Sequence, residues 1–420
     1  DGLRQVDGLT DRGSMQSSRR RVFSLPQIPT SWRVPVTEIS EPPPKEAGVQ
    51  LFGLRRPLLT QRVDERDQIW KALLEVERSA RAQAVVVRGG AGAGKSSLVE
   101  WLVERADETG AATVLKAFHS PVGSALEGLP GMFARYFHCV GLAWSQALVR
   151  IQNSLWHAGI SDPRRALAMA EVVRPAIIEG KRPSTKRIHF DSPEERYLAM
   201  GGVLTHLAGE RLVVAWIDDV QWGRDTLHFV QSFLASQDEA PARVLLLVTA
   251  RAEGNAGGSE QQALLSSLVD RGDVGVLDLG PMARGEMGEL LGSLISLEPE
   301  VLEAVCVRSG GNPLFALQLV GDWVERKVLE LCDGTYALRD GASTSIPDTI
   351  QEIWSSRIHT LLEDVGGDER EEAARRALEL AACLGHEVEE ELWQAVCAQG
   401  AVQIPPRLLD KLLKSGLAEA

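Results

Sequence analysis

A glycine-rich stretch at residues 89–97, GGAGAGKSS, combines residue types that bind phosphate. Its spacing, Gly89-x4-Gly94-Lys95-Ser96, is typical of a phosphate-binding loop. Glycines let the backbone turn tightly and point several N–H groups at one anion, and the start of the next helix adds partial positive charge. Lys95 would reach the β- and γ-phosphates of a nucleotide, and the Ser96 hydroxyl would bind Mg²⁺. The predicted phosphate-binding residues are Gly89, Gly90, Ala91, Gly92, Ala93, Gly94, Lys95, Ser96 and Ser97.

The residues on either side of this loop fit the same interpretation. Ala84–Val87 form an apolar run typical of a buried strand, and Leu98–Val103 place apolar residues on one helical face. A strand, a glycine loop and a helix therefore follow one another in the order that a phosphate-binding loop requires. The spacing excludes a dinucleotide-binding loop, because Lys95 stands where the third glycine of that motif should be.

A second group of candidate residues ends the run Leu212–Asp219, LVVAWIDD. A continuous apolar run that ends in acids is typical of a buried parallel strand, and ligands bind at the carboxyl ends of such strands. We expect Asp218 to hold Mg²⁺ directly or through water. Asp219 either orients or activates the attacking water or caps the next turn, and the sequence leaves both roles open. We expect Trp222 to serve packing rather than chemistry.

Further apolar runs predict the rest of a sheet. Two strands are predicted at Thr113–Phe118 and Val274–Leu279. A third, buried strand is predicted at Arg243–Arg251, with Thr249 and Arg251 at its end. A sensor residue at that end would approach the γ-phosphate. Strands that alternate with helices predict an α/β fold in which helices flank a parallel sheet. The candidate catalytic residues are Lys95, Asp218, Asp219 and Arg251.

The composition limits the class of protein. The chain has 420 residues, of which 44% are hydrophobic and 25% charged, which is ordinary for a globular protein with more than one domain. The net charge of −13 argues against a broad nucleic-acid-binding surface. No apolar run is long enough for a membrane span, and no signal peptide is visible. The five scattered cysteines suggest neither disulfides nor a zinc site, so we expect a cytoplasmic protein. We expect structural roles for the four histidines between residues 120 and 206, which are His138, His157, His189 and His206.

The pattern along the chain divides it into four parts. Residues 1–50 predict an irregular linker, part of which docks on a neighbouring surface through apolar residues such as Ile28 and Trp32. We expect residues 51–280 to form the α/β core. We expect residues 281–343 to form a helical lid and residues 344–420 to form a further helical unit. The lid contains three predicted helices, at residues 284–296, 299–309 and Leu314–Lys327. A short predicted hairpin around Asp333-Gly334 follows the third helix. The acidic stretch Glu363–Glu372 predicts a loop, and Leu408–Ser415 predicts the last helix, closed by Gly416.

With these residues placed, residues 57–420 resemble the STAND class of AAA+-like ATPases (signal-transduction ATPases with numerous domains). The resemblance is greatest to ATPase modules of large bacterial regulators, including modules joined to serine/threonine kinase domains. It rests on GGAGAGKSS, WIDDVQW, LLLVTAR and GGNPLF. It implies that Arg251 senses the γ-phosphate and that Pro313 contacts the nucleotide from the lid. The stretch from Leu58 resembles the adenine-side motif of the class through Arg62 and Glu65, although Gln61 replaces the usual glycine.

The resemblance implies an ATP-dependent switch that binds ATP or ADP with Mg²⁺ and hydrolyses ATP slowly. It also implies sensor and effector domains outside this sequence, allows a homo-oligomer, and identifies residues 344–420 as a winged-helix domain that the sequence leaves incomplete. One alternative is a transcription regulator that binds DNA through the winged helix, which the acidic charge disfavours. Another is a scaffold with a degenerate site, which the intact Lys95, Ser96 and Asp218 disfavour.

Overall fold

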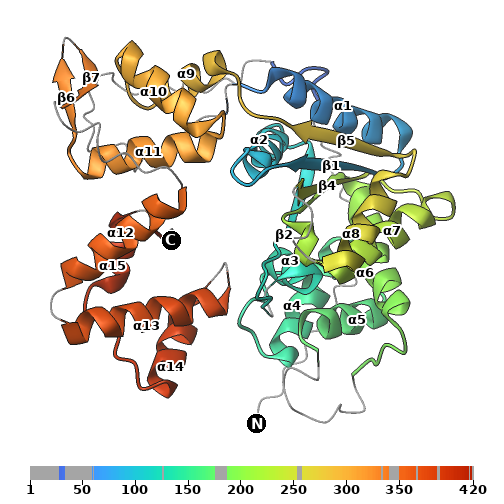
Figure 1. The fold of residues 1–420 in the computed structure, drawn as a ribbon. Helices are drawn as coiled ribbons and strands as arrows, with labels where there is room; N and C mark the ends of the chain where they lie inside the picture. Colours follow the sequence, from blue (N-terminus) through green and yellow to red (C-terminus); the bar gives the residue numbers. More distant parts are fainter. Residues whose placement is uncertain are drawn as a thin grey trace, which may run out of the picture.

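The computed structural model describes residues 28–33, 59, 61–124, 127–175, 187–252, 258–332, 334–339, 350–365, 368–385, 388–415 and 417–418. The predicted linker at 1–50 therefore lies outside the described residues except for 28–33. The described part contains a five-stranded sheet with helices on both faces, followed by a lid and a group of C-terminal helices (Figure 1). This is the predicted α/β fold, in which helices flank a parallel sheet.

The five strands are β1 (Gln83–Gly89), β2 (Ala112–Ala117), β3 (Leu212–Ile217), β4 (Val244–Arg251) and β5 (Val274–Leu279). They lie in the order β2-β3-β4-β1-β5, and every pairing is parallel. All carboxyl ends therefore meet at one edge of the sheet, where Gly89 pairs with Arg251. Because β3 ends at Ile217, both acids of the second candidate group follow the strand and lie at that edge.

Two hydrophobic cores lie on opposite faces of the sheet, because successive side chains of a strand alternate between its faces. Val85 and Val87 belong to the core beneath α1 and α2, whereas Val86 belongs to the core on the other face. The first face is covered by α1 (Val63–Ser79) and α2 (Lys95–Glu108). The second is covered by α3 (Gly128–Tyr136), α4 (Trp144–His157), α5 (Pro163–Val173), α6 (Pro193–Glu210), α7 (Arg224–Ala235) and α8 (Gly258–Val269). Strand β3 is buried throughout, as its unbroken apolar sequence predicts.

The N-terminal segment at 28–33 docks on the first of these helical layers. The Trp32 ring packs edge-on against Trp101 of α2, with the ring centroids 5.2 Å apart. Its indole N–H donates to Asp67 Oδ1 at 2.7 Å, and the Trp70 indole N–H donates to the Pro29 carbonyl at 3.1 Å. These contacts confirm the predicted docking for Trp32.

The lid has a hydrophobic core of its own. Its described elements are α9 (Arg284–Gly292), α10 (Pro299–Ser309), α11 (Pro313–Glu325), β6 (Leu329–Cys332) and β7 (Thr335–Leu338). Val305, Leu319 and Trp323 are buried between these elements. The predicted helices and the antiparallel hairpin are confirmed, although α9 ends earlier than the predicted segment 284–296.

The C-terminal helices are α12 (Ile350–Val365), α13 (Asp368–Leu384), α14 (Glu390–Gln399) and α15 (Leu408–Lys414), and they pack around Leu362, Trp393 and Leu408. The predicted loop Glu363–Glu372 is wrong, because α12 continues to Val365 and α13 begins at Asp368. Acidic residues in the first turn of α13 favour that helix, since they interact with its partial positive charge. From residue 350 onward, the described residues contain helices and no strand, so a winged helix stays a prediction. None of the described helices is both long enough and apolar enough to cross a bilayer.

Candidate functional site

The glycine loop lies between the end of β1 and the first residue of α2. Gly92 and Gly94 have φ angles of 77° and 92°, which residues with side chains rarely adopt. A Cβ at Gly92 would also lie only 2.6 Å from Asn312 Oδ1 of the lid. The loop therefore requires glycine there, both for its backbone turn and for its close approach to the lid.

Lys95 is the first residue of α2, and it is 7% exposed. Its ammonium group donates to the carbonyl oxygens of Gly89 at 3.1 Å and Gly90 at 2.9 Å. These two hydrogen bonds hold the buried ammonium group against the loop backbone, and Lys95 itself stands at the N-terminus of a long helix. A cation and a helix N-terminus at one place favour an anionic ligand.

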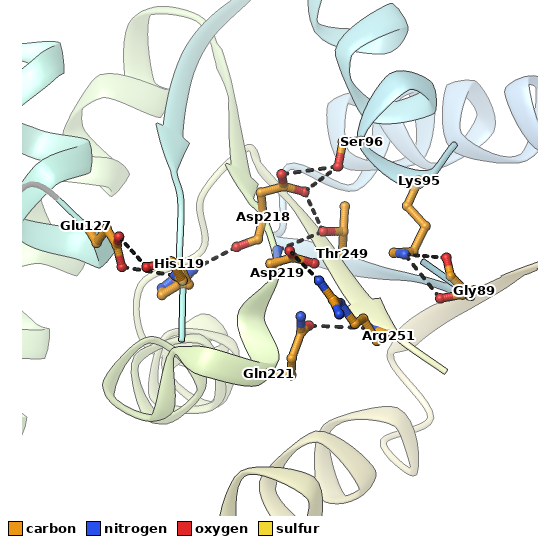
Figure 2. Close-up of polar contacts among 12 residues, drawn as sticks. Gly89, Lys95, Ser96, His119, Glu127, Asp218, Asp219, Gln221, Thr249 and Arg251 are labelled. Atoms are coloured by element: carbon orange, nitrogen blue, oxygen red, sulfur yellow. Dashed lines mark hydrogen bonds and ion pairs between the residues drawn. The ribbon is translucent and has the colours of Figure 1, made fainter. Parts of the chain in front are cut away.

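Asp218 connects three elements of the core at the edge of the sheet (Figure 2). Its carboxylate accepts from Ser96 Oγ at 2.9 Å and 3.1 Å, and from Thr249 Oγ1 at 2.5 Å. Thr249 belongs to β4 and is completely buried. A hydroxyl and a carboxylate oxygen side by side are the ligands that Mg²⁺ prefers. The paired Ser96 and Asp218 are therefore the candidate metal ligands. No cluster of three or more histidine, cysteine or acidic side chains that could hold a metal occurs among the described residues.

Asp219 adopts a left-handed backbone conformation, with φ 50° and ψ 46°. It precedes the 3-10 helix η2 (Val220–Trp222), but its carboxylate makes no capping hydrogen bond to that helix. Instead it lies 3.9 Å from the Arg251 guanidinium, and both side chains are about one-third exposed. The Arg251 backbone N–H donates to Gln221 Oε1 at 3.3 Å. Of the two roles left open by the sequence, this geometry disfavours the cap.

A cavity of about 370 Å³ brings the candidate residues together. This volume is in the range of small-molecule sites. Its polar lining consists of the glycine loop with Lys95 and Ser96, together with Asp219 and Arg251. Its apolar lining residues are Leu59, Met282, Leu290, Pro313, Leu314 and Leu317. The cavity thus combines phosphate-type contacts with apolar surface.

The lid contacts the glycine loop directly at the start of α11. The Asn312 side chain caps this helix by accepting from the Phe315 N–H at 3.1 Å, and its amide donates to the Ala91 carbonyl at 2.8 Å. The Leu314 N–H donates to the Gly92 carbonyl at 3.3 Å. Pro313, the first residue of α11, lines the cavity between these two contacts. The lid position therefore depends on the conformation of the glycine loop.

Arg62 connects the start of the core with the lid. Its guanidinium donates to the Gly280 carbonyl at 2.6 Å and to Glu65 Oε1 at 3.1 Å, and its backbone N–H donates to Glu286 Oε1 at 3.2 Å. Arg62 also lines the cavity. The Arg62–Glu65 pair of the sequence motif is thus a contact in the structure, although these hydrogen bonds direct the guanidinium toward the protein.

The structure also brings in two residues that the sequence did not single out. Asn312 could have been recognised as a helix cap, because it stands directly before the first helical proline. His119 follows β2 and hydrogen-bonds to the Asp218 carbonyl, a contact between residues 99 positions apart that no local pattern signals (Figure 2).

Comparisons with known proteins give one family match and several weak structural likenesses. Residues 59–248 match the family model described as an AAA ATPase domain. A search of curated proteins found no match. Among solved structures, a STAND protein with a tetratricopeptide repeat sensor from Pyrococcus horikoshii has a TM-score of 0.42 at 16% identity, over 87% of this chain and 40% of that protein. This chain therefore spans less than half of that protein's length.

The ORC2 protein of Aeropyrum pernix, solved in ADPNP–ADP complexes, has a TM-score of 0.40 at 14% identity, over 88% of this chain and 90% of that one. Cdc6p of Pyrobaculum aerophilum has a TM-score of 0.39 at 13% identity, over 86% of this chain and 87% of that one. Likenesses at such TM-scores carry no information about function. The family match covers the glycine loop, the paired acids and most of the sheet: residues 59–248 of this chain are similar to an AAA ATPase domain.

Proposed function

We propose that this chain is an ATP-binding switch module that hydrolyses ATP slowly within a larger regulatory protein. The observation that carries the proposal is a single cavity walled by both the glycine loop and the lid. A nucleotide in that cavity would contact the core (residues 51–280) and the lid (281–343) at once. The C-terminal unit (344–420), which we propose to be winged-helix-like, would then follow the lid.

The residues of the cavity fit a nucleotide with Mg²⁺. The glycine loop and Lys95 supply N–H groups and a cation for the phosphates, and the apolar lining that includes Leu290 and Leu317 supplies a surface for the base. Ser96 and Asp218 would hold Mg²⁺, which supplies charge neutralisation on the phosphates when it is bound.

The remaining polar residues of the cavity would act on hydrolysis. Asp219 lines the cavity, and its carboxylate would orient the attacking water or accept its proton. The Arg251 guanidinium, at the end of the neighbouring strand, would approach the γ-phosphate and stabilise the charge that develops there. Arg251 would thereby report whether ATP or ADP is bound.

A switch requires contacts that ATP makes in one conformation and ADP does not, because a ligand shifts an equilibrium only by its differential affinity for the two states. Arg251 from the core and Pro313 from the lid line the same cavity and could supply such contacts. The hydrogen bonds of Asn312 and Leu314 to the glycine loop would carry the difference into the lid.

The test is the thermal unfolding of the protein with Mg²⁺ and ATP, ADP or no nucleotide, together with steady-state phosphate release. A ligand at 100 times its dissociation constant stabilises the folded protein by about 2.7 kcal/mol, so both nucleotides should raise the melting temperature clearly. We expect phosphate release well below the median enzyme turnover of about 10 s⁻¹. A melting temperature that neither nucleotide changes, without phosphate release, would overturn the proposal.

A further inference from the structure

His119 lies at the carboxyl end of the sheet, two residues beyond β2 and beside the paired acids (Figure 2). None of the chemistry proposed above uses it. Its ring contacts the backbone of Asp218 and the side chain of Thr226, so it connects the edge strand with β3 and with the start of α7.

The two ring nitrogens of His119 have different partners, which fixes the tautomer. Nδ1 lies 2.8 Å from the Asp218 carbonyl oxygen, which can only accept, so Nδ1 carries the hydrogen. Nε2 lies 2.9 Å from Thr226 Oγ1 and accepts from that hydroxyl. Burial lowers the pKa of His119, against the opposing effect of Glu127, Asp218 and Asp219.

The peptide unit between Asp218 and Asp219 is held on both sides. His119 binds its C=O, and Thr249 Oγ1 accepts from its N–H, which belongs to Asp219, at 2.9 Å. This peptide unit leads into the left-handed conformation of Asp219, which is unfavourable for a residue with a side chain and persists only where surrounding contacts impose it. Rotation of the peptide would move the Asp219 carboxylate relative to the cavity.

The surroundings leave the ring little freedom to turn. A Cβ at Gly223 would lie 2.3 Å from the His119 ring, so the glycine gives the ring its space. Thr226, which orients Nε2, is 2% exposed. A buried ring that is oriented by one hydroxyl and binds one specific carbonyl is suited to fixing a backbone conformation.

We infer that His119 is a positioning residue for hydrolysis: it fixes the Asp218–Asp219 peptide so that the Asp219 carboxylate faces the cavity. This inference rests on the proposed ATPase function. His119 is not among the residues that line the cavity. Its loss should therefore lower turnover and leave ATP affinity nearly unchanged.

The experiment compares His119→Ala and His119→Asn with the wild-type protein. The asparagine amide nitrogen stands at the side-chain position of Nδ1 and can donate to the same carbonyl, whereas alanine cannot. His206→Ala is the matched control, because His206 Nε2 also lies within hydrogen-bond distance of a backbone carbonyl, that of Ala158 at 2.6 Å, but His206 does not line the cavity. We would measure ATP affinity, phosphate release, and amide hydrogen exchange of residues 216–223 without nucleotide.

We expect His119→Ala to lower kcat about 10- to 100-fold, as small misplacements of catalytic groups do, with ATP affinity within about threefold of wild type. His119→Asn should recover much of the turnover. Exchange of residues 216–223 should be faster in His119→Ala only, because the fixed turn opens more readily. Unchanged turnover in His119→Ala, equal losses of affinity and turnover, or equal effects of His206→Ala would each overturn the inference.

A second pair of variants covers the case in which His119→Ala does not fold. Thr226→Val removes the hydroxyl that orients Nε2, and Thr226→Ser keeps it. The Thr226→Val variant should have a lower turnover and faster amide hydrogen exchange at residues 216–223, and the Thr226→Ser variant should show neither change. Equal behaviour of the two variants would contradict the inference. If the wild-type protein releases no phosphate, the proposed function fails, and the exchange measurements still decide whether His119 fixes the turn.

Discussion

At the scale of single residues, Lys95 carries the largest share of the expected phosphate affinity. It is the buried cation beside the glycine loop, and its ammonium already lies against the loop backbone. Lys95→Ala should weaken ATP binding by about 10- to 100-fold or more, because hydrogen bonds between charged partners contribute about 1.5–3 kcal/mol each. The measurement is ATP affinity by calorimetry. Lys71→Ala, at an exposed lysine of α1, is the control, and equal affinities of the two variants would argue against the phosphate site.

The paired acids differ in their surroundings, so their substitutions should differ in effect. Asp218 accepts hydrogen bonds from Ser96 and Thr249, whereas the Asp219 carboxylate lies 3.9 Å from the Arg251 guanidinium. Asp218→Asn should weaken Mg²⁺-dependent ATP binding, because an amide is a poor Mg²⁺ ligand beside these hydroxyls. Asp219→Asn should mainly slow phosphate release. Titration of Mg²⁺ at fixed ATP separates the two effects, and an equal loss of affinity in both variants would contradict separate roles.

At the scale of elements, the Asn312 side chain both caps α11 and joins this helix to the glycine loop. Asn312 caps the helix through its oxygen and reaches the glycine loop through its nitrogen. Asn312→Asp keeps the cap but places a carboxylate against the Ala91 carbonyl, whereas Asn312→Ala loses both contacts. Loss of the cap costs about 1 kcal/mol.

We therefore expect Asn312→Asp to fold nearly as stably as the wild-type protein and to bind ATP more weakly, because the added negative charge lies beside the predicted phosphate site. Asn312→Ala should lose both stability and lid contact. Urea unfolding and ATP affinity, measured for both variants, check the two functions separately. Wild-type affinity in Asn312→Asp would mean that the contact between the lid and the loop does not matter for binding.

At the scale of the whole molecule, the C-terminal helices return to the core. A Cβ at Gly385, just beyond α13, would lie 3.1 Å from Glu127 Oε1 and 3.4 Å from Ser124 Cβ, so the end of α13 touches the segment that follows β2 (Figure 1). If nucleotide sets the angle between core, lid and C-terminal helices, this contact should change between ATP and ADP.

Cys383 offers a probe at this contact, because it is exposed and lies two residues before Gly385. We expect an environment-sensitive fluorophore on Cys383, in a Cys332→Ser background, to change its emission with Mg²⁺ and ATP and to change less with ADP. The same label in a Lys95→Ala protein should not respond. Identical emission with ATP, with ADP and without nucleotide would show that the C-terminal helices do not follow the bound nucleotide.

The sequence by itself determined the features that depend on neighbours along the chain. The apolar run of β1, the glycine loop and the start of α2 are contiguous, so the strand–loop–helix order follows from local sequence. The buried strands β3 and β4 were predictable for the same reason, because a run of apolar residues has few alternatives to burial. The predicted loop at Glu363–Glu372 failed because acidic residues suit a helix start as well as a solvent-exposed turn.

Only the tertiary structure decided how the site is completed. The sheet order places β2 beside β3, which brings His119 to Asp218 across 99 positions, and the packing of the lid brings Asn312 to Ala91 across 221. A lone histidine or asparagine has no periodicity, and its role depends on which carbonyl the fold places next to it. The left-handed turn at Asp219 likewise depends on hydrogen bonds from separate elements, one from His119 and one to Thr249. Local sequence sets which residues can bind phosphate, and the folded sheet and lid set what surrounds them.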